Sequence, residues 1–159
     1  QMKSIYKAYF AKDCMYHVKP FPGICEMLSE LKKRGIRIAV LSNKPHAQAI
    51  DVVESLFGKD YFDYIQGQTE SGQNESGLSY RLGDLLNWYQ KLIYSESTSY
   101  VGDTNTDMQT GNAAHMHPVG VLWGFRDRKE LEENHSEYVI EKPQELIEIL
   151  EKINGGDNK

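Results

Sequence analysis

The sequence predicts an α/β fold with a doubly wound parallel sheet, and three observations carry that prediction. Short apolar runs alternate with amphipathic stretches of helical period along the 159 residues, which is the order of βαβ units. The run at 36–41 is almost continuously apolar, as in a strand buried on both faces of a parallel sheet. Polar residues follow directly after the runs at 36–41 and 99–101, where open parallel sheets bind their ligands.

The helices are expected where apolar residues recur every three or four positions, and the strands where short apolar runs stand between turn-forming residues. The expected elements, in chain order, are a helix over 1–17, a helix over 24–34, a strand over 36–41, a helix over 42–57, a strand over 61–65, a helix over 84–93, a strand over 99–101, a helix over 107–114, strands over 118–122 and 138–140, and a helix over 145–153. A loop rich in glycine and serine is expected over 67–79, and a frayed tail over 154–159.

Particular residues set the ends of these helices. The prolines of the KPFPG turn end the first helix, because the residue before a proline disfavours helical backbone. Gly35 ends the second helix, after three basic residues that suit the negative end of the helix dipole. The helix over 42–57 is expected to begin with Ser42 or Asn43 as its capping residue.

Two histidines near the end of the helix over 107–114 admit two interpretations. The H-x-H spacing of His115 and His117 fits part of a zinc site, and it also fits a turn. The turn is favoured, because histidine accepts a positive φ more readily than most residues and such backbone is common directly after a helix.

Composition and charge limit the function classes. A net charge of −5 argues against a nucleic-acid-binding domain, which usually carries a basic face. No apolar run approaches the 18 residues that suggest a membrane-spanning helix, and the N-terminus has no signal-peptide core. The two cysteines, Cys14 and Cys25, have no zinc-ligand spacing and are expected to be free thiols. We therefore expect a cytoplasmic protein that binds neither nucleic acid nor a membrane.

Two strand ends carry residues with chemistry. Ser42 and Asn43 follow the strand at 36–41, and a hydroxyl with backbone N–H groups at a strand-to-helix junction can bind an anion. GDTNTD follows the strand at 99–101 and places Asp103 in the loop and Asp107 in the first helical turn. Such carboxylate oxygens suit Mg²⁺, which binds carboxylates, water and substrate phosphate. Capping of the helix is the alternative role for both aspartates.

The strand ending in VLSNK, the segment YVGDTNTDMQTGNAA and the segment VGVLWGF together resemble the haloacid dehalogenase-like (HAD) hydrolases, and among them the phosphoglycolate phosphatases. The resemblance runs from about residue 18 to residue 153. It implies a Rossmann-like core over 18–153, with 1–17 as a remnant of the family's helical cap. It also implies that Ser42 and the Asn43 backbone hold a phosphoryl group, that Asp103 binds Mg²⁺ and that Asp107 supports the metal site.

The chain departs from the family pattern at two motifs. The family's first motif, DxDGT, supplies the nucleophilic aspartate and lies on the central strand, and no two of the nine aspartates here stand in a D-x-D relation. We therefore expect a core without its central strand. The family's third motif supplies a lysine, which would fall near Leu78. Arg81 is the nearest cation and the candidate phosphate ligand there, although its fork differs from a lysine point charge.

Two hypotheses of different class follow for function. One is a Mg²⁺-dependent phosphomonoester hydrolase acting on a small phosphorylated metabolite, of which this chain alone is inactive. The other is a non-catalytic remnant or interaction module that keeps the HAD fold. A second copy of the chain or an N-terminal segment is expected to complete the sheet. The alternative is that the strands at 36–41 and 99–101 close up and pair directly. The DNA upstream of Gln1 distinguishes the two hypotheses, because a reading frame with DxDGT would favour the enzyme.

Overall fold

The structure is a computed structural model, and it describes residues 18–68 and 97–155. The helices predicted over 1–17 and 84–93 lie outside the described residues, as does most of the predicted loop. The described elements are α2 (Ile24–Lys33), β1 (Ala39–Pro45), α3 (His46–Phe57), β2 (Tyr64–Gln68), β3 (Ser99–Gly102), α5 (Asn105–Ala113), β4 (His117–Val121), α6 (Arg128–Glu133), β5 (Tyr138–Ile140) and α7 (Glu145–Gly155). None of these helices is long and apolar enough to cross a membrane.

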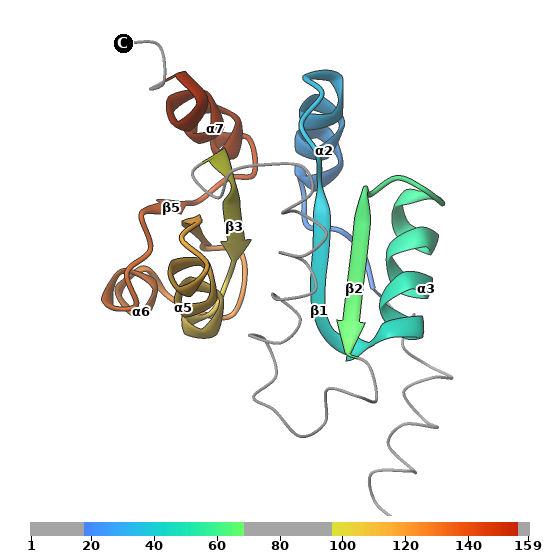
Figure 1. The fold of residues 1–159 in the computed structure, drawn as a ribbon, viewed down its shortest axis with the longest axis horizontal. Helices are drawn as coiled ribbons and strands as arrows, with labels where there is room; N and C mark the ends of the chain where they lie inside the picture. The colour runs from blue at the N-terminus through green and yellow to red at the C-terminus, as the bar shows by residue number, and fades with distance from the viewer. Residues whose placement is uncertain (1–17, 69–96, 156–159) are drawn as a thin grey trace, which may run out of the picture.

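All strand pairs in the described part of the chain are parallel, which confirms the predicted fold class (Figure 1). The larger sheet has the order β3-β4-β5, and the smaller one pairs β1 with β2. β4 is the central strand of the larger sheet, and Val119 in it is fully buried. Met108 from α5 and Leu131 from α6 are also fully buried, so helices pack against this sheet through large apolar side chains.

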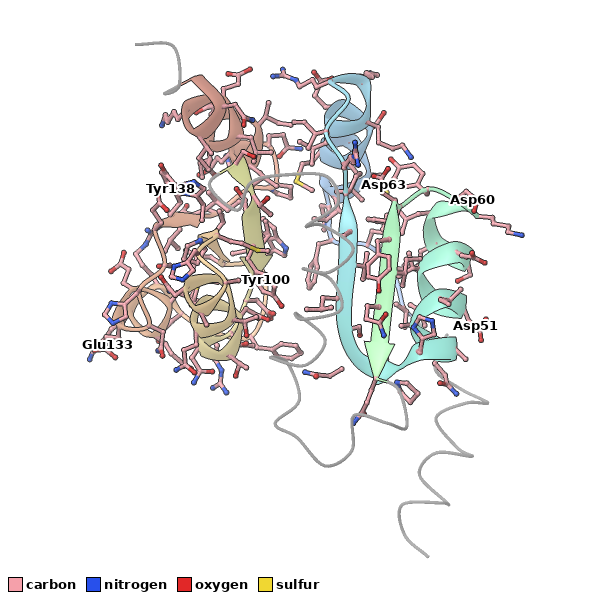
Figure 2. The ribbon with its side chains drawn as sticks, in the orientation of Figure 1. Asp51, Asp60, Asp63, Tyr100, Glu133 and Tyr138 are labelled. Atoms are coloured by element: carbon pink, nitrogen blue, oxygen red, sulfur yellow. The ribbon has the colours of Figure 1, made fainter. Side chains whose placement is uncertain are left out.

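The smaller sheet is held in register from its first residues. Ala39 of β1 pairs with Tyr64 of β2, and the register shifts between Leu41 and Pro45. Before the strands begin, the Ile38 N–H donates to the Asp63 carboxylate over 2.8 Å, and Asp63, labelled in Figure 2, returns its own N–H to the Ile38 carbonyl. The two strands therefore start together.

Helix α2 joins the two sheets through a shared core. Its buried residues Met27, Leu28 and Leu31 belong to one apolar cluster with residues of β4, β5 and α7. At the exposed end of the same contact, the Arg34 guanidinium bonds Glu151 of α7. Such exposed pairs contribute little, so we attribute the contact mainly to the apolar side chains.

Several element boundaries differ from the prediction. β1 continues through Pro45 and α3 begins at His46, so the prediction that Ser42 or Asn43 caps this helix is wrong. Proline suits a helix start because its φ is already near the helical value. β2 covers 64–68 rather than 61–65. α7 extends through Gly155, past the expected start of the tail at residue 154.

The sequence did not predict the short helix α6, but it did predict the turn at His115. α6 is short, and its signal in the sequence is the capping residue Asp127, whose carboxylate accepts the Glu130 N–H over 2.9 Å. The turn at His115 is confirmed, because this residue has a φ of 55° directly after α5.

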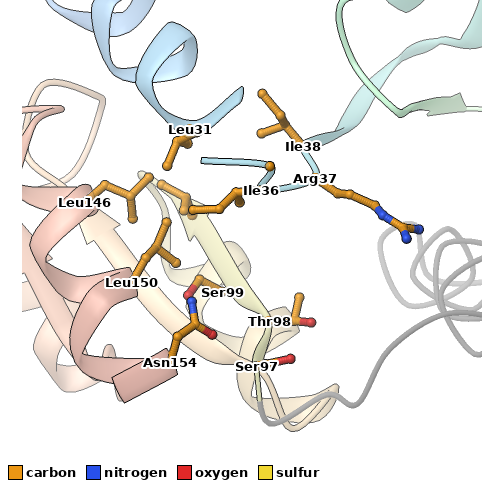
Figure 3. Close-up of a pocket in the computed structure, with 12 residues that line it drawn as sticks. Leu31, Ile36, Arg37, Ile38, Ser97, Thr98, Ser99, Leu146, Leu150 and Asn154 are labelled. Carbon is orange, nitrogen blue, oxygen red and sulfur yellow. The ribbon is translucent and has the colours of Figure 1, made fainter. Parts of the chain in front are cut away.

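A cleft separates β1 from β3. The two strands are not paired, and the figure shows them running in the same direction on either side of it. One cavity of about 270 Å³ is lined by Ala39 and Leu41 from β1 and by Tyr100 and Val101 from β3. A second cavity of about 380 Å³ continues toward α7, where Figure 3 shows Leu146 and Leu150. The two strands therefore do not close up on each other.

The burial of the strands differs between the centre of the larger sheet and the two strands beside the cleft. Four of the five residues of β4 are buried, whereas no residue of β1 or β3 is buried, and Val101 is 42% exposed. Strands of parallel sheets are ordinarily covered on both faces. Within the described residues, β1 and β3 are thus the least covered strands of the two sheets, and they flank the same cavity.

We predict that the 159-residue chain on its own is marginally stable or self-associates, because apolar strands at open edges promote association. Size-exclusion chromatography with light scattering and a thermal melt would test this. The expected result is a dimer, or a monomer with a broad, low transition. A monomer that melts cooperatively well above 60 °C, a level that few mesophilic domains pass, would contradict the prediction.

Candidate functional site

The loop between β3 and α5 is organised around the carboxylate of Asp107. One oxygen of this group, Oδ2, accepts the Asp103 N–H over 3.1 Å, the Thr104 N–H over 3.0 Å and the Thr104 hydroxyl over 2.7 Å. The Thr104 hydroxyl in turn accepts the Asp107 N–H, which completes a reciprocal capping box. Asp107 therefore fixes the backbone on which Asp103 stands.

Close approach of the backbone at Gly102 makes this arrangement possible. A Cβ atom added to Gly102 would lie 2.3 Å from the Asp107 Cβ and 2.6 Å from Oδ2. Any side chain at position 102 would therefore displace the carboxylate. The sequence GD at the end of β3 thus has a steric reason, beyond the common occurrence of glycine in turns.

The Asp103 side chain is half-buried and has one defined partner. Its Oδ2 atom accepts a hydrogen bond of 2.8 Å from the N–H of Phe125, a residue of the loop after β4. Because β3 and β4 are neighbouring parallel strands, the loops after them meet at one edge of the sheet. Asp103 is thus held from two loops, by Asp107 through the backbone and by the Phe125 amide through its carboxylate.

The end of β1 is arranged differently. The Ser42 hydroxyl accepts the Lys44 N–H over 3.2 Å, so it makes a local hydrogen bond within β1. His46, the first residue of α3, is half-buried, and its Nδ1 atom accepts the Gly67 N–H from β2 over 3.2 Å. A Cβ atom at Gly67 would lie 2.6 Å from the His46 Cα. Strand β2 therefore supports the junction that carries Ser42 and Asn43.

The two loops open on one cleft. Leu41, which precedes Ser42, and Asp107 line the same cavity of about 270 Å³ between β1 and β3. Strand direction puts the carboxyl ends of β1 and β3 at the same end of this cleft. The structure thus brings the Ser42–Asn43 segment and the Asp103–Asp107 loop to one edge. Arg81, the third predicted phosphate ligand, lies outside the described residues.

The donor set fits a magnesium ion only with help from water and phosphate. No group of three or more His, Cys, Asp or Glu side chains in the described residues could hold a metal by itself. Mg²⁺, however, is usually bound by one or two carboxylates and keeps its other positions for water and substrate phosphate. Asp103 offers a half-buried carboxylate in the loop after β3, whereas three hydrogen bonds already occupy Oδ2 of Asp107.

The fold and this pair of strand-end loops define a class of protein, and comparison with known families gives its name. The family of haloacid dehalogenase-like hydrolases matches residues 1–121, which is more than half of the chain. The chain therefore belongs to the haloacid dehalogenase-like hydrolases.

Individual relatives support the same family. The chain is 24% identical to a phosphoglycolate phosphatase of Aquifex aeolicus over 147 residues, which cover 92% of this chain and 66% of that protein. It is 28% identical to the pyrophosphatase PpaX of Bacillus mycoides over 138 residues, 87% of this chain and 63% of the relative. The chain thus spans about two thirds or less of the length of these relatives.

A solved structure confirms the fold. The haloacid dehalogenase-like protein SP0104 of Streptococcus pneumoniae superposes with a TM-score of 0.80 at 23% identity, covering 92% of this chain and 67% of that one. The Rossmann-like HAD core predicted from the motifs is therefore correct. The phosphate and metal roles of individual residues stay predictions.

Sequence reasoning missed the residues that hold the site in place. The Phe125 amide leaves no trace in the sequence, since any residue except proline supplies a backbone N–H. Thr104 had a signal, because a threonine three positions before a carboxylate is a capping-box pattern at a helix start. Gly67 was assigned to a loop, whereas it is a buried residue of β2.

We predict that Asp107→Ala lowers the free energy of unfolding by about 2–3 kcal/mol, because it removes three hydrogen bonds to a charged group and one half of a capping box. Asp103→Ala is the matched control and should cost about 1 kcal/mol, since its carboxylate accepts one backbone N–H. Urea denaturation of both variants would measure the difference. Equal losses would show that Asp107 does not organise the loop.

Proposed function

We propose that this chain carries the phosphate-binding and metal-binding residues of a Mg²⁺-dependent phosphomonoesterase that acts on a small phosphorylated acid. The observation that supports this most is the Asp103 carboxylate, half-buried at the end of β3 and held on one oxygen by the Phe125 amide. Asp107 of the same loop and Leu41, the residue before Ser42, line one cavity, and the backbone and hydroxyl of the Ser42–Asn43 segment suit an anion. The match to phosphoglycolate phosphatases favours a substrate of that class.

Asp103 is the residue that would hold the ion, and Asp107 would support it from behind through the loop backbone. When bound, Mg²⁺ offsets charge on the phosphoryl oxygens and orients the group. The chain's own residues would do the rest of the binding: the Ser42 hydroxyl and the Asn43 N–H would take phosphoryl oxygens, and Arg81 would add a positive charge. Stabilising these oxygens is most of what a phosphoryl-transfer site must do.

The attacking group is absent from this picture. In the family the nucleophile is the first aspartate of DxDGT, and the 159 residues contain no D-x-D pair. The Ser42 hydroxyl accepts the Lys44 N–H over 3.2 Å, and the proposal gives it the role of a phosphate ligand. We therefore propose that the chain binds phosphate without hydrolysing phosphate esters, and that a further strand with a carboxylate is needed for turnover. A cytoplasmic location stays a prediction.

We predict no appreciable phosphatase activity of the 159-residue chain with Mg²⁺ and an aryl phosphate, because positioning and charge alone do not supply an attacking group. The control is Asp103→Asn in the same preparation. Turnover that survives this substitution would come from a contaminant. Turnover that the substitution abolishes would belong to the chain and would contradict the prediction.

Weak phosphate binding is expected in the same chain, because the backbone N–H groups at the junction between β1 and α3 do not depend on the missing motif. Titration with inorganic phosphate should shift the amide resonances of residues 42–44 and 46, and those of 103–105 when Mg²⁺ is present. Residues 24–33 of α2, remote from the strand ends, serve as the internal control. Unchanged resonances at millimolar phosphate would show that the strand ends do not form an anion site.

A further inference from the structure

Gly124 lies in the turn after β4, and its lack of a side chain is required by its neighbour. A Cβ atom added to Gly124 would lie 2.2 Å from both the Cβ and the Oδ2 atoms of Asp103. Real Cβ atoms essentially never come within 3.0 Å of such atoms, so a side chain here would force the aspartate or the turn to move. Gly124 itself is exposed, which means that burial does not explain the need for glycine.

Backbone conformation does not explain it either. Gly35 and Gly58 have φ values of 72° and 96° and nothing within 4 Å, so they serve turns that require left-handed backbone. Gly124 is not among the glycines with positive φ in the described residues. Its backbone would accept alanine, and only the space taken by Asp103 excludes a side chain.

The consequence is that the backbone at Gly124 and Phe125 holds the Asp103 carboxylate, an arrangement that we call the clamp. Since the chain at Gly124 passes directly over Asp103, the next amide, that of Phe125, can donate to Oδ2 over 2.8 Å. This is the one hydrogen bond to the Asp103 side chain from the described residues, and it leaves the other oxygen available. Hydrogen bonds of this kind orient a ligating carboxylate and are as necessary to a metal site as the ligand itself.

We propose that Gly124 is a positioning residue: it lets the Phe125 amide hold Oδ2 of Asp103 and so fixes the direction of the other carboxylate oxygen. The part of this inference that concerns metal binding rests on the proposed function, which assigns Mg²⁺ to Asp103. The clamp itself is a statement about two loops of this chain, and it can be tested without any metal.

The test is Gly124→Ala in the full 159-residue chain, with two measurements. In metal-free protein the Phe125 amide resonance should move upfield and its hydrogen exchange should accelerate, because the added methyl group breaks the bond to Asp103. In a Mg²⁺ titration followed by calorimetry the variant should bind about 10–100-fold more weakly than the unchanged chain, which is the usual loss when a ligand's supporting partner is removed.

Gly120→Ala is the matched control, because it makes the same chemical change within β4. Its Cβ would lie 2.9 Å from the Leu131 Cδ1 atom, so it strains the packing against α6 without touching Asp103. It should lower the melting temperature and leave the Phe125 amide and the Mg²⁺ affinity unchanged. A purely structural effect of Gly124→Ala would instead resemble this control.

The outcomes separate this inference from the proposed function. If the unchanged chain binds no Mg²⁺, the metal role of Asp103 is wrong. The resonance and hydrogen exchange of the Phe125 amide then test the hydrogen bond to Asp103 by themselves. A Phe125 amide that is unperturbed in Gly124→Ala overturns the inference whatever the metal does. A perturbed amide with unchanged Mg²⁺ affinity overturns the positioning role toward the metal. Loss of both, with Gly120→Ala unaffected, supports it.

Discussion

The carboxylate of Asp107 is the group on which the candidate site depends. Its Oδ2 atom takes hydrogen bonds from two consecutive backbone N–H groups and a hydroxyl, and this fixes the chain between β3 and α5. A carboxylate at the start of a helix is also favoured by the helix dipole. From the first turn of α5, the same residue thus completes the cap of the helix and sets the position of Asp103. A structural role and a functional role are therefore joined in one side chain.

The core of the molecule shows why this loop can be rigid although β3 is partly exposed. Helix α5 packs on β3 and β4 through the fully buried Met108, one residue after Asp107. Gly111 in the same helix approaches Tyr100 and Pro118 so closely that an added Cβ would lie 3.0 and 3.1 Å from their Cβ atoms. The helix is therefore fixed against β3 and β4. Exposure of Val101 at the open edge leaves this contact intact.

Periodicity and turn chemistry predicted most of the described elements, because those signals are local. The strand at 138–140 and the start of the helix at 145 agree with the structure, and Gly35 ends its helix with the expected positive φ. The start of α3 was wrong, since serine and asparagine are strong caps in isolation, but here the strand continues and pairs Pro45 with Gln68 of β2. Pairing between strands overrode the local preference, and a single sequence carries little trace of it.

The site was predictable to a different extent. Asp103, Asp107 and Ser42 could be placed because strand ends of a parallel sheet meet at one edge, which is a rule of topology. The partners that orient them could not, since Phe125 acts through its amide and His46 through a contact with Gly67 that depends on β2. Contacts between loops of different βα units are set by tertiary packing. They become visible only when both loops are placed.

Three glycines at this edge illustrate how such a site is built. At Gly67, Gly102 and Gly124 an added Cβ would lie within 2.6 Å of a neighbouring atom, and each of those neighbours belongs to the candidate site or its support. In each case the missing side chain lets a backbone approach His46, Asp107 or Asp103 directly. Backbone donors are the same for nearly every residue type, so the geometry depends on a few glycines and acids.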